Sequence, residues 1–382
     1  MNTVRLGDIA SIERRTVDPK TLDPATPYIG LEHIERGGRL LSVATVGSAG
    51  LKSSKFTFEP AHILFGKLRP NLAKVTDPEK GGVCSTDLLP IRVCTTADRS
   101  YLKHYLRWGP TVSEVTRLAS GANLPRISPG SLEDLLVPAL PIEEQRRIAT
   151  ILDRADAQRA CRRAQLVMLE ALEGAVFTKH MESLSSRKTV PLGDWASLAA
   201  GRSIVADDSS SSSRWRVLKI SAVTSGLFRR DESKPLPLDY KPPLAHRLSV
   251  GDLLMSRANT TELVGASAIA SGDVSGLALP DKIWKFAWKR PAEPRFWKAY
   301  LMQSHVRVQI SAMSGGSGGS MKNIPKAKIL KLPVPDVSLK VQREFAAVVE
   351  KIDAQRAHVE RTLALEDELF ASLQYRAFCG EL

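Results

Sequence analysis

Two stretches of the chain carry apolar residues at spacings of three and four without an interior proline, from about residue 142 to 180 and from about 338 to 377. Such spacing predicts amphipathic helices, and at 1.5 Å per residue each would extend roughly 55 Å. The longer segments before each helix mix short apolar runs, turns and helical patterns. The chain is therefore predicted to be an α/β (α+β) protein ordered as globule, helix, globule, helix.

The two predicted helices repeat each other at an offset of 197 residues. The pentapeptide DAQRA occurs at 156–160 and again at 353–357, and Gln145 recurs as Gln342. The apolar stripe recurs as well: Ile148, Ile151, Leu152, Ala155, Leu166, Leu172 and Val176 match Phe345, Val348, Val349, Ile352, Leu363, Leu369 and Leu373. Equivalent narrow stripes favour two helices that pack side by side like a coiled coil. The alternative is that each helix only caps its own globule.

The globules repeat more loosely. VRLGDIA (4–10) matches VPLGDWA (190–196), HILFGKLRP (62–70) matches DLLMSRANT (252–260), and GANLPRI (121–127) matches GSMKNI (319–324). Strands are predicted within 55–68 and 83–94, a helix over 99–118 broken near Gly109-Pro110, and a matching helix over 294–310. The serine-rich run at 209–216 is interpreted as an insertion, and SGGSGG (314–319) as a flexible loop. We expect four parts: a first domain 1–141, a spacer helix 142–185, a second domain 186–337 and a C-terminal spacer helix 338–382.

The net charge of +13 is concentrated in the two globules. Divided after residues 141, 181 and 337, the chain carries +4, +1, +10 and −2. A basic surface of this kind favours a polyanionic partner such as nucleic acid. No apolar stretch is long enough to span a bilayer and the N-terminus lacks a signal-peptide core, so we expect a cytoplasmic protein without a membrane partner.

The sequence lacks a recognisable catalytic or metal-binding constellation. There is no phosphate-binding loop of the Walker type, and the four cysteines (Cys84, Cys94, Cys161, Cys379) and seven histidines show no ligand spacing. Glu232-Ser-Lys234 has the acid-x-Lys spacing of some nucleases, but Asp207 and Asp208 upstream lie in a serine-rich run, so a solvated charge cluster is the preferred interpretation. A non-catalytic chain without metal or cofactor is predicted.

Four motifs resemble those of a known family, the specificity subunit of type I DNA restriction–modification systems. They are LGDIA at the start of the first globule, echoed by LGDWA in the second, HILFGKLRP, the run LPIEEQRRIATILDRADAQ, and the closing FCGEL (378–382). Two segments depart from the pattern. PDVSLKVQREFA (335–346) replaces the double-glutamate form, and DLLMSRANT lacks the LRP ending, which leaves the recognition details of the second globule open.

The resemblance implies a division of labour. Each globule would be a target recognition domain that reads one half of a split, asymmetric site in double-stranded DNA. The two helices would pack antiparallel, set the length of the unread spacer, and dock two methyltransferase subunits. Restriction (helicase–nuclease) subunits would join them. S-adenosylmethionine, ATP and Mg would then be bound by the partners, and no cofactor by this chain.

Basic and amide side chains near the repeated motifs are the candidates for DNA contact, because Arg and Lys suit guanine edges or phosphates and Asn suits adenine. They are Lys67, Arg69, Asn71, Lys74 and Arg126 in the first copy, and Arg257, Asn259, Thr260, Lys322 and Asn323 in the second. Each could equally be a solvated surface residue. The alternative function is a coiled-coil adapter whose basic domains bind nucleic acid without a sequence-specific DNA role.

Overall fold

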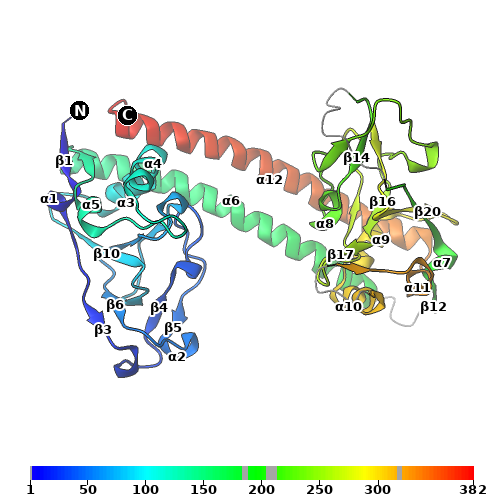
Figure 1. Ribbon diagram of the computed structural model, residues 1–382, viewed down its shortest axis with the longest axis horizontal. Coiled ribbons are helices and arrows are strands. Elements are labelled where there is room, and N and C mark those ends of the chain that lie inside the picture. The colour runs from blue at the N-terminus through cyan, green and yellow to red at the C-terminus, as the bar shows by residue number, and fades with distance from the viewer. Residues whose placement is uncertain (1, 183–187, 204–212, 316–320) are drawn as a thin grey trace. The chain divides into compact units, whose positions relative to one another are not determined.

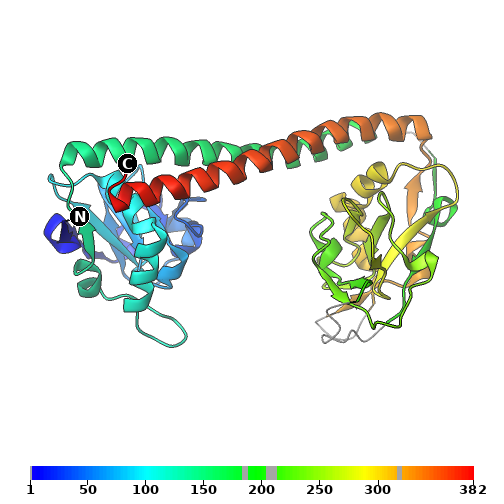
Figure 2. The same ribbon diagram turned by 90° about the horizontal axis from the view of Figure 1, so that it is seen from above.

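The computed structural model describes residues 2–182, 188–203, 213–315 and 321–382. Contacts divide the chain into two compact units, residues 1–164 with 360–382 and residues 165–359. Each unit therefore contains one globular lobe and one segment of each long helix (Figures 1 and 2). Because the units divide both helices, the four-part division predicted from the sequence stays a prediction.

The first lobe is built on two sheets. The antiparallel first sheet has the order β2 (Ala10–Ile12), β10 (Leu88–Val93), β7 (His62–Gly66), β8 (Val75–Thr76). The second has the order β3 (Thr16–Val17), β6 (Lys55–Phe58), β9 (Gly82–Cys84), β4 (Pro27–Ile29), β5 (Ala44–Thr45), in which β4 and β9 are parallel. β1 (Thr3–Arg5) pairs with β11 (Leu136–Pro138), so the start of the lobe lies beside the strand that leads out of it.

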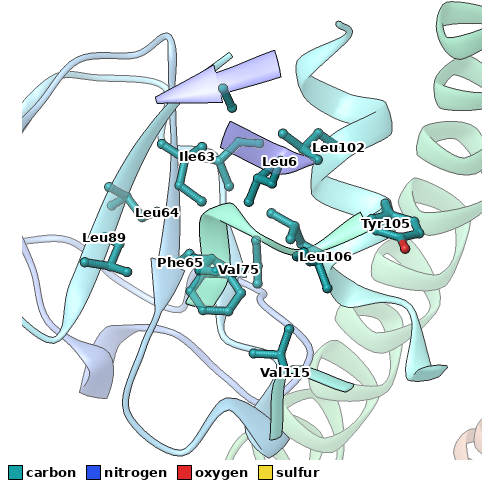
Figure 3. Packing of buried hydrophobic residues seen from close by; sticks show 14 of the residues in the cluster. Leu6, Ile63, Leu64, Phe65, Val75, Leu89, Leu102, Tyr105, Leu106 and Val115 are labelled. Carbon is teal, nitrogen blue, oxygen red and sulfur yellow. The ribbon is translucent and has the colours of Figure 1, made fainter. Parts of the chain in front are cut away.

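Helices α3 (Arg99–Arg107) and α4 (Gly109–Leu118) pack on the first sheet. The Asp98 carboxylate caps α3, and α4 begins at Gly109-Pro110, so the predicted break is confirmed. Figure 3 shows Ile63 and Phe65 of β7 and Leu102 and Leu106 of α3 in one buried cluster. The lobe also contains the short helices α1 (Leu6–Ile9), α2 (Val46–Ala49) and α5 (Pro129–Glu133) and the 3-10 turns η1 (Pro19–Thr21), η2 (Leu31–His33) and η3 (Pro70–Leu72).

The second lobe repeats this plan. Its four-stranded sheet has the order β13 (Ala196–Ala200), β20 (Ile283–Trp288), β16 (Leu253–Ser256), β18 (Ser267–Ile269), and β12 (Thr189–Pro191) pairs with β22 (Pro333–Pro335). The second sheet is reduced to β15 (Ser233–Pro235), β14 (Arg216–Leu218) and β19 (Leu277–Ala278), with β14 and β19 parallel. It keeps the counterpart of the β4–β9 pair, while no counterpart of β3 and β6 occurs among the described residues.

The helical region of the second lobe differs from the prediction of one helix over 294–310. Two helices form, α9 (Pro294–Leu301) and α10 (Ser304–Met313). Gln303 adopts an extended backbone conformation and ends the first helix without a proline. The break lets Val306 and Ile310 of α10 reach the core, as the break at Gly109 does for α4. Further short elements are α7 (Leu192–Trp195), α8 (Ser221–Thr224), α11 (Lys326–Ile329), β17 (Ala258–Asn259) and β21 (Lys322–Asn323).

The two long helices, α6 (Ile142–Glu182) and α12 (Leu339–Cys379), are both 41 residues long and begin 197 residues apart. In the first unit Arg147 of α6 donates to the Leu382 carbonyl, and Arg159 Nε lies 2.6 Å from an oxygen of Asp367. In the second unit Arg356 lies 3.1 Å from Glu173. In these contacts, residues later in α6 meet residues earlier in α12, so the two helices run antiparallel within each unit.

The repeated DAQRA motif supplies interhelical contacts. Arg159 and Arg356 are its equivalent arginines, and each pairs with the aspartate three residues before it, at 2.9 Å in both copies. The Arg159 guanidinium also stacks over the Phe370 ring at 4.1 Å, whereas Arg356 forms an ion pair with Glu173. Position 173 is equivalent to position 370, so the same arginine meets an aromatic ring in one unit and a carboxylate in the other.

Aromatic residues of the long helices anchor them in the lobes. Phe378 near the end of α12 contacts the rings of Tyr101, Tyr105 and Trp108 in the first lobe. Phe177 near the end of α6 contacts Phe296 in the second lobe. Each lobe thus holds the start of one helix and the end of the other, and the idea that each helix only caps its own globule is wrong.

The predicted apolar stripe is only partly buried. Ile148 and Leu152 of α6 and Phe345 and Val349 of α12 lie in the cores as expected. Leu172 and Leu369 were predicted on the same stripe and are instead exposed. In the middle of the helices, the arginine contacts described above supply part of the interhelical packing. The two leucines are therefore not required for packing there.

A polar cluster fastens α6 to α3 in the first lobe. Asp153 of α6 accepts hydrogen bonds from Ser100 Oγ at 2.6 Å and from the buried His104 Nε2 at 2.8 Å, and Lys103 Nζ lies 3.4 Å away. Burial raises the pKa of Asp153, but the bonds from His104 and Ser100 and the charge of Lys103 outweigh it, so the pKa lies well below its usual range. The carboxylate is therefore ionised wherever the lobe is folded near neutral pH.

All four cysteines are free thiols, and only Cys84 is buried. Burial raises the pKa of Cys84 to about 12. None of the helices within the described ranges is long and apolar enough to cross a membrane. Half of the serine-rich run (209–212) and most of the SGGSGG loop (316–319) lie outside the described residues, so the predictions made for them stay predictions.

Candidate nucleic-acid interface

Two loops of the first lobe that are far apart in sequence lie side by side. The segment after β7 pairs with the segment before α5 through a bridge between Leu68 and Arg126. The Arg69 amide donates to the Pro125 carbonyl at 2.8 Å, and the Ile127 amide to the Lys67 carbonyl at 3.1 Å. The motifs HILFGKLRP and GANLPRI therefore form one surface, and the structure brings Lys67, Arg69 and Arg126 together.

Asp87 organises the cations of this surface. Its carboxylate lies 3.1 Å from Arg126 Nε and 4.0 Å from Lys67 Nζ, and its backbone carbonyl accepts from the Lys67 amide at 2.9 Å. All three side chains are partly exposed. A carboxylate held between two cations restricts their rotamers, so both cations have defined directions before any ligand binds. Sequence reasoning missed Asp87, because an isolated aspartate before a strand carries no distinctive pattern.

The next residues of the loop are backbone-strained. Arg69 and Ala73 have φ of 50° and 48°, and in the part of the chain that the structure describes no other non-glycine residue has a positive φ. The left-handed region costs an L-residue roughly 1–2 kcal/mol, and such strain is concentrated at functional sites. Both residues flank η3, and Arg69 and Asn71 are exposed. The loop is therefore held in a conformation that costs conformational energy.

Lys74 differs from the other candidates of the first lobe. Its ammonium group donates to the Leu31 carbonyl at 2.7 Å, and the residue is half-buried. It braces the loop after η3 against the start of a neighbouring 3-10 turn. Its ammonium group is already hydrogen-bonded to a backbone carbonyl, and its contact with DNA stays a prediction.

The second lobe forms the same surface from β17 and β21. Ala258 pairs with Asn323 and Asn259 with Lys322, while the Ile324 amide donates to the Arg257 carbonyl at 2.9 Å. The Arg257 guanidinium lies 3.4 Å from the Asn323 side-chain oxygen. The exposed Thr260 follows directly, with its amide bonded to the Asn259 side chain at 2.9 Å. All five candidates of the second lobe therefore lie on or beside one two-stranded element.

The two surfaces share their backbone and differ in their side chains. The Lys67 amide donates to the Asp87 carbonyl, and the equivalent Arg257 amide donates to the Lys282 carbonyl at 3.0 Å. An acidic residue in the first lobe thus corresponds to a basic residue in the second. Arg126 likewise corresponds to Asn323. The two surfaces present different hydrogen-bonding groups from the same frame.

A buried glutamine holds each lobe to its helix. The Gln145 oxygen accepts from the Asp98 amide at 2.9 Å, and its nitrogen donates to the Leu140 carbonyl at 2.8 Å. Gln342 makes the equivalent bonds at the same distances to the Glu293 amide and the Val337 carbonyl. The sequence repeat singles out both glutamines, but only these hydrogen bonds show that they hold each lobe to its helix.

A cleft of about 1240 Å³ opens in the first unit between the β4–β5 region and α6. Its wall mixes charges of both signs, including Arg36, Arg39, Asp77 and Asp156. Arg107 lies beneath it and donates to the Val75 and Gly38 carbonyls, and burial lowers its pKa. With acidic and basic groups interspersed, the cleft lacks the single sign of charge that would attract a polyanion.

The described ranges contain no group of three or more His, Cys, Asp or Glu side chains that could hold a metal ion. Glu232 accepts from Ser221 Oγ at 2.7 Å and lies 3.9 Å from Lys219, so it belongs to a surface charge cluster. Asp207 and Asp208, its proposed companions in a nuclease motif, lie outside the described residues.

Residues 1–171 match the family described as the type I restriction modification DNA specificity domain. This part of the chain is similar to the domain that defines that family. The match covers the first lobe with its paired loops and the first part of α6, and it confirms the resemblance seen in the sequence motifs.

Curated relatives match different shares of the chain. The specificity subunit of the type I restriction enzyme EcoKI from Escherichia coli (strain K12) is 23% identical over 303 residues, which cover 74% of this chain and 65% of that subunit. The specificity subunit of the EcoDI enzyme from Escherichia coli is 30% identical over 147 residues, or 38% of this chain and 32% of that subunit. The chain thus spans less than two thirds of the length of these relatives.

Solved structures share the fold over the whole chain. A chain from work on complex assembly and conformational transition of the type I R-M system aligns with a TM-score of 0.57 at 18% identity, covering 100% of this chain and 98% of its own. The S subunit of the type I restriction-modification system from M. genitalium aligns with a TM-score of 0.58 at 13% identity, covering 99% and 96%. The predicted α/β fold with two related lobes and two long helices is confirmed.

Proposed function

We propose that this chain is the DNA specificity subunit of a type I restriction–modification complex, which reads a split, asymmetric site in double-stranded DNA. The observation that carries the proposal is the paired-loop surface, present once in each lobe with the same backbone and different side chains. One frame built twice with unlike side chains suits a reader of two unlike half-sites. A general polyanion binder would gain nothing from that difference.

The side chains suggest what each half-site contains. Arg126, directed by Asp87, can donate to the two acceptors of a guanine edge, with Lys67 beside it. In the second lobe Asn323 and Asn259 can pair with adenine, with Arg257 beside them. These assignments make the two half-sites chemically different.

Exposed apolar residues on the long helices suggest where partners dock. Met168 and Leu172 of α6 are 69% and 45% exposed, and Leu365 and Leu369 of α12, their equivalents at the 197-residue offset, are 67% and 54% exposed. Each pair lies four residues apart on one helix face. Two equivalent apolar patches fit two copies of one partner, which the family resemblance identifies as methyltransferase subunits.

Catalysis would then belong to the partners. Methyltransferase subunits would supply S-adenosylmethionine chemistry, and restriction (helicase–nuclease) subunits would use ATP and Mg. This chain would bind none of these cofactors and would act in the cytoplasm as a non-catalytic, DNA-binding subunit. Its contribution is to choose the sequence and to hold the partners at it.

The test is a selection from a pool of random duplexes by the complex of this chain with its methyltransferase subunits. The proposal expects recovered duplexes to share two short, different half-sites at a fixed separation. Lys67→Ala with Arg69→Ala should relax one half-site, and Arg257→Ala with Asn259→Ala the other. Retention of duplexes without any shared sequence would favour the coiled-coil adapter instead.

The docking surfaces can be tested separately by the mass of the assembled complex. Met168→Asp should remove one methyltransferase subunit, Leu365→Asp the other, and both together should leave the chain without partners. Val308→Asp is the matched control, because Val308 of α10 is equally exposed and lies outside both patches. Variants that still bind two partner subunits would contradict the assignment.

A further inference from the structure

Both lobes present an exposed apolar side chain at the same place on the candidate interface. Leu124 is 47% exposed and Met321 is 46% exposed. Leu124 lies two residues before Arg126, and Met321 lies two residues before Asn323, the equivalent position. Buried isoleucines follow, Ile127 and Ile324, whose amides donate to the Lys67 and Arg257 carbonyls. The backbone frame therefore fixes the two apolar residues as counterparts.

Backbone hydrogen bonds hold the chain just after each of these residues. In the first lobe Ser120 and Arg126 exchange two backbone hydrogen bonds of 2.9 and 2.8 Å, so that residues 121–125 form a short closed loop. In the second lobe Gly315 and Asn323 exchange the equivalent bonds of 2.9 and 3.0 Å. In each lobe these bonds fix the backbone two residues after the exposed side chain, which leaves that side chain less conformational freedom to lose on binding.

The surroundings of each apolar residue are cationic or amide-bearing. Leu124 lies beside Arg126 and the exposed Arg69, while Met321 is followed by Lys322 and Asn323. An isolated exposed leucine or methionine needs no explanation. Here, two exposed apolar side chains lie at equivalent positions, and each is beside groups that suit phosphates and base edges. This arrangement matches a ligand that has anionic margins and an apolar interior. Stacked base pairs between phosphate backbones have that composition.

We propose that Leu124 and Met321 are apolar wedges, each entering the base stack of one half-site and kinking the duplex. The inference rests on the proposed function and deepens it. Apolar side chains that enter a base step partly unstack it, and the cost of a few kcal/mol is offset by the additional contacts that the bent duplex makes. The cations beside each wedge supply those contacts to the phosphates. Specificity would then include how easily a step unstacks, besides its base edges.

The experiment uses the methyltransferase complex and its selected duplex with 2-aminopurine placed at successive steps of each half-site, together with end labels that report bending by energy transfer. Binding should raise the fluorescence at one step of each half-site. Leu124→Ala should abolish the rise in one half-site only, Met321→Ala in the other, and each should reduce bending. We expect each to weaken binding about tenfold, as the loss of roughly one buried apolar side chain would.

Leu41→Ala and Leu238→Ala are the controls, since both leucines are at least as exposed and lie elsewhere in their lobes. Leu124→Met and Met321→Leu should keep the fluorescence rise, because either side chain can act as a wedge. A selected half-site that is bound without any rise, or a rise that survives Leu124→Ala and Met321→Ala, overturns the wedge and leaves the proposed function standing. A complex that selects no sequence at all overturns both.

Discussion

Removal of the glutamine at the start of each long helix should weaken the two units unequally. Gln145→Leu and Gln342→Leu keep the side-chain length and remove the hydrogen-bonding groups. Gln342 has one partner that Gln145 lacks, the indole nitrogen of the fully buried Trp297, at 3.1 Å. The second unit should therefore lose more stability than the first.

The magnitude follows from the groups left without a partner. Gln145→Leu leaves one backbone amide and one carbonyl unpaired, and Gln342→Leu leaves these two and an indole N–H. A buried unpaired group costs about 1–3 kcal/mol. Because the two bonds of Gln145 are only part-buried and their partners can recruit water, whereas the Val337 carbonyl and the Trp297 indole are buried, we expect about 2 kcal/mol for Gln145→Leu and about 4 kcal/mol for Gln342→Leu.

The assay is urea denaturation followed by tryptophan fluorescence and circular dichroism, with Trp297→Phe completing a double-mutant cycle. Trp297→Phe should cost about 1–2 kcal/mol in the natural chain and clearly less in the Gln342→Leu background, because the indole has already lost its acceptor there. Equal costs for the two glutamine variants, or an unchanged cost of Trp297→Phe in both backgrounds, would refute the reasoning.

Three further perturbations test the anchoring of the helices. Asp153→Asn should cost the first unit about 1–3 kcal/mol at pH 7, since the buried His104 loses its anionic acceptor. The folded-state pKa of Asp153 lies below its unfolded value, so its contribution to stability is present above about pH 4 and fades as the pH falls further. Acid titration monitored by circular dichroism should therefore show the natural chain and the variant becoming more similar in stability below that pH. Phe378→Ala should lower the free energy of unfolding by about 3–5 kcal/mol in thermal or urea unfolding, because it leaves a cavity in an aromatic cluster. Tyr375→Ala is the control, since Tyr375 is exposed, and it should change the free energy of unfolding by no more than about 0.5 kcal/mol. Similar values for both variants would contradict the anchoring of α12 in the first lobe. Glu173→Gln should destabilise the second unit by about 1–2 kcal/mol because two cations lose their shared carboxylate, and a free energy of unfolding that stays unchanged in urea denaturation would contradict this role.

The long helices and the repeat were predictable because their information is local. A packing stripe at helical spacing and an exact repeat of DAQRA survive in the sequence without knowledge of the contacts. The helical stretches expected at about 142–180 and 338–377 agree with α6 and α12 to within two residues. The break between α9 and α10 was missed because Gln303, unlike Gly109-Pro110, carries no local preference for ending a helix.

The composition of the candidate site was less accessible. Sequence motifs singled out the loop after β7 and the loop before α5, but only the hydrogen bonds between them show that they form one surface. Asp87 in the first lobe and Lys282 in the second each enter the surface of their own lobe from a third segment, and no spacing rule links them to the motifs. Lys74 carries a charge that suits DNA, yet its bond to a backbone carbonyl is visible only in the fold. Pairings between distant segments are set by packing, which a single sequence does not reveal.

The proposed function requires the paired helices to hold two unlike DNA readers at a set separation, and matched insertions test this requirement most directly. Seven residues of strong helix formers would be inserted both between Ala164 and Gln165 and between Val359 and Glu360, the two points at which the chain passes from one compact unit to the other. Seven residues make nearly two whole turns and lengthen each helix by about 10.5 Å, close to three base pairs at about 3.4 Å each. The account predicts that the methyltransferase complex of this variant selects the same two half-sites with a spacer about three base pairs longer. An unchanged spacer, with both half-sites still selected, would contradict it.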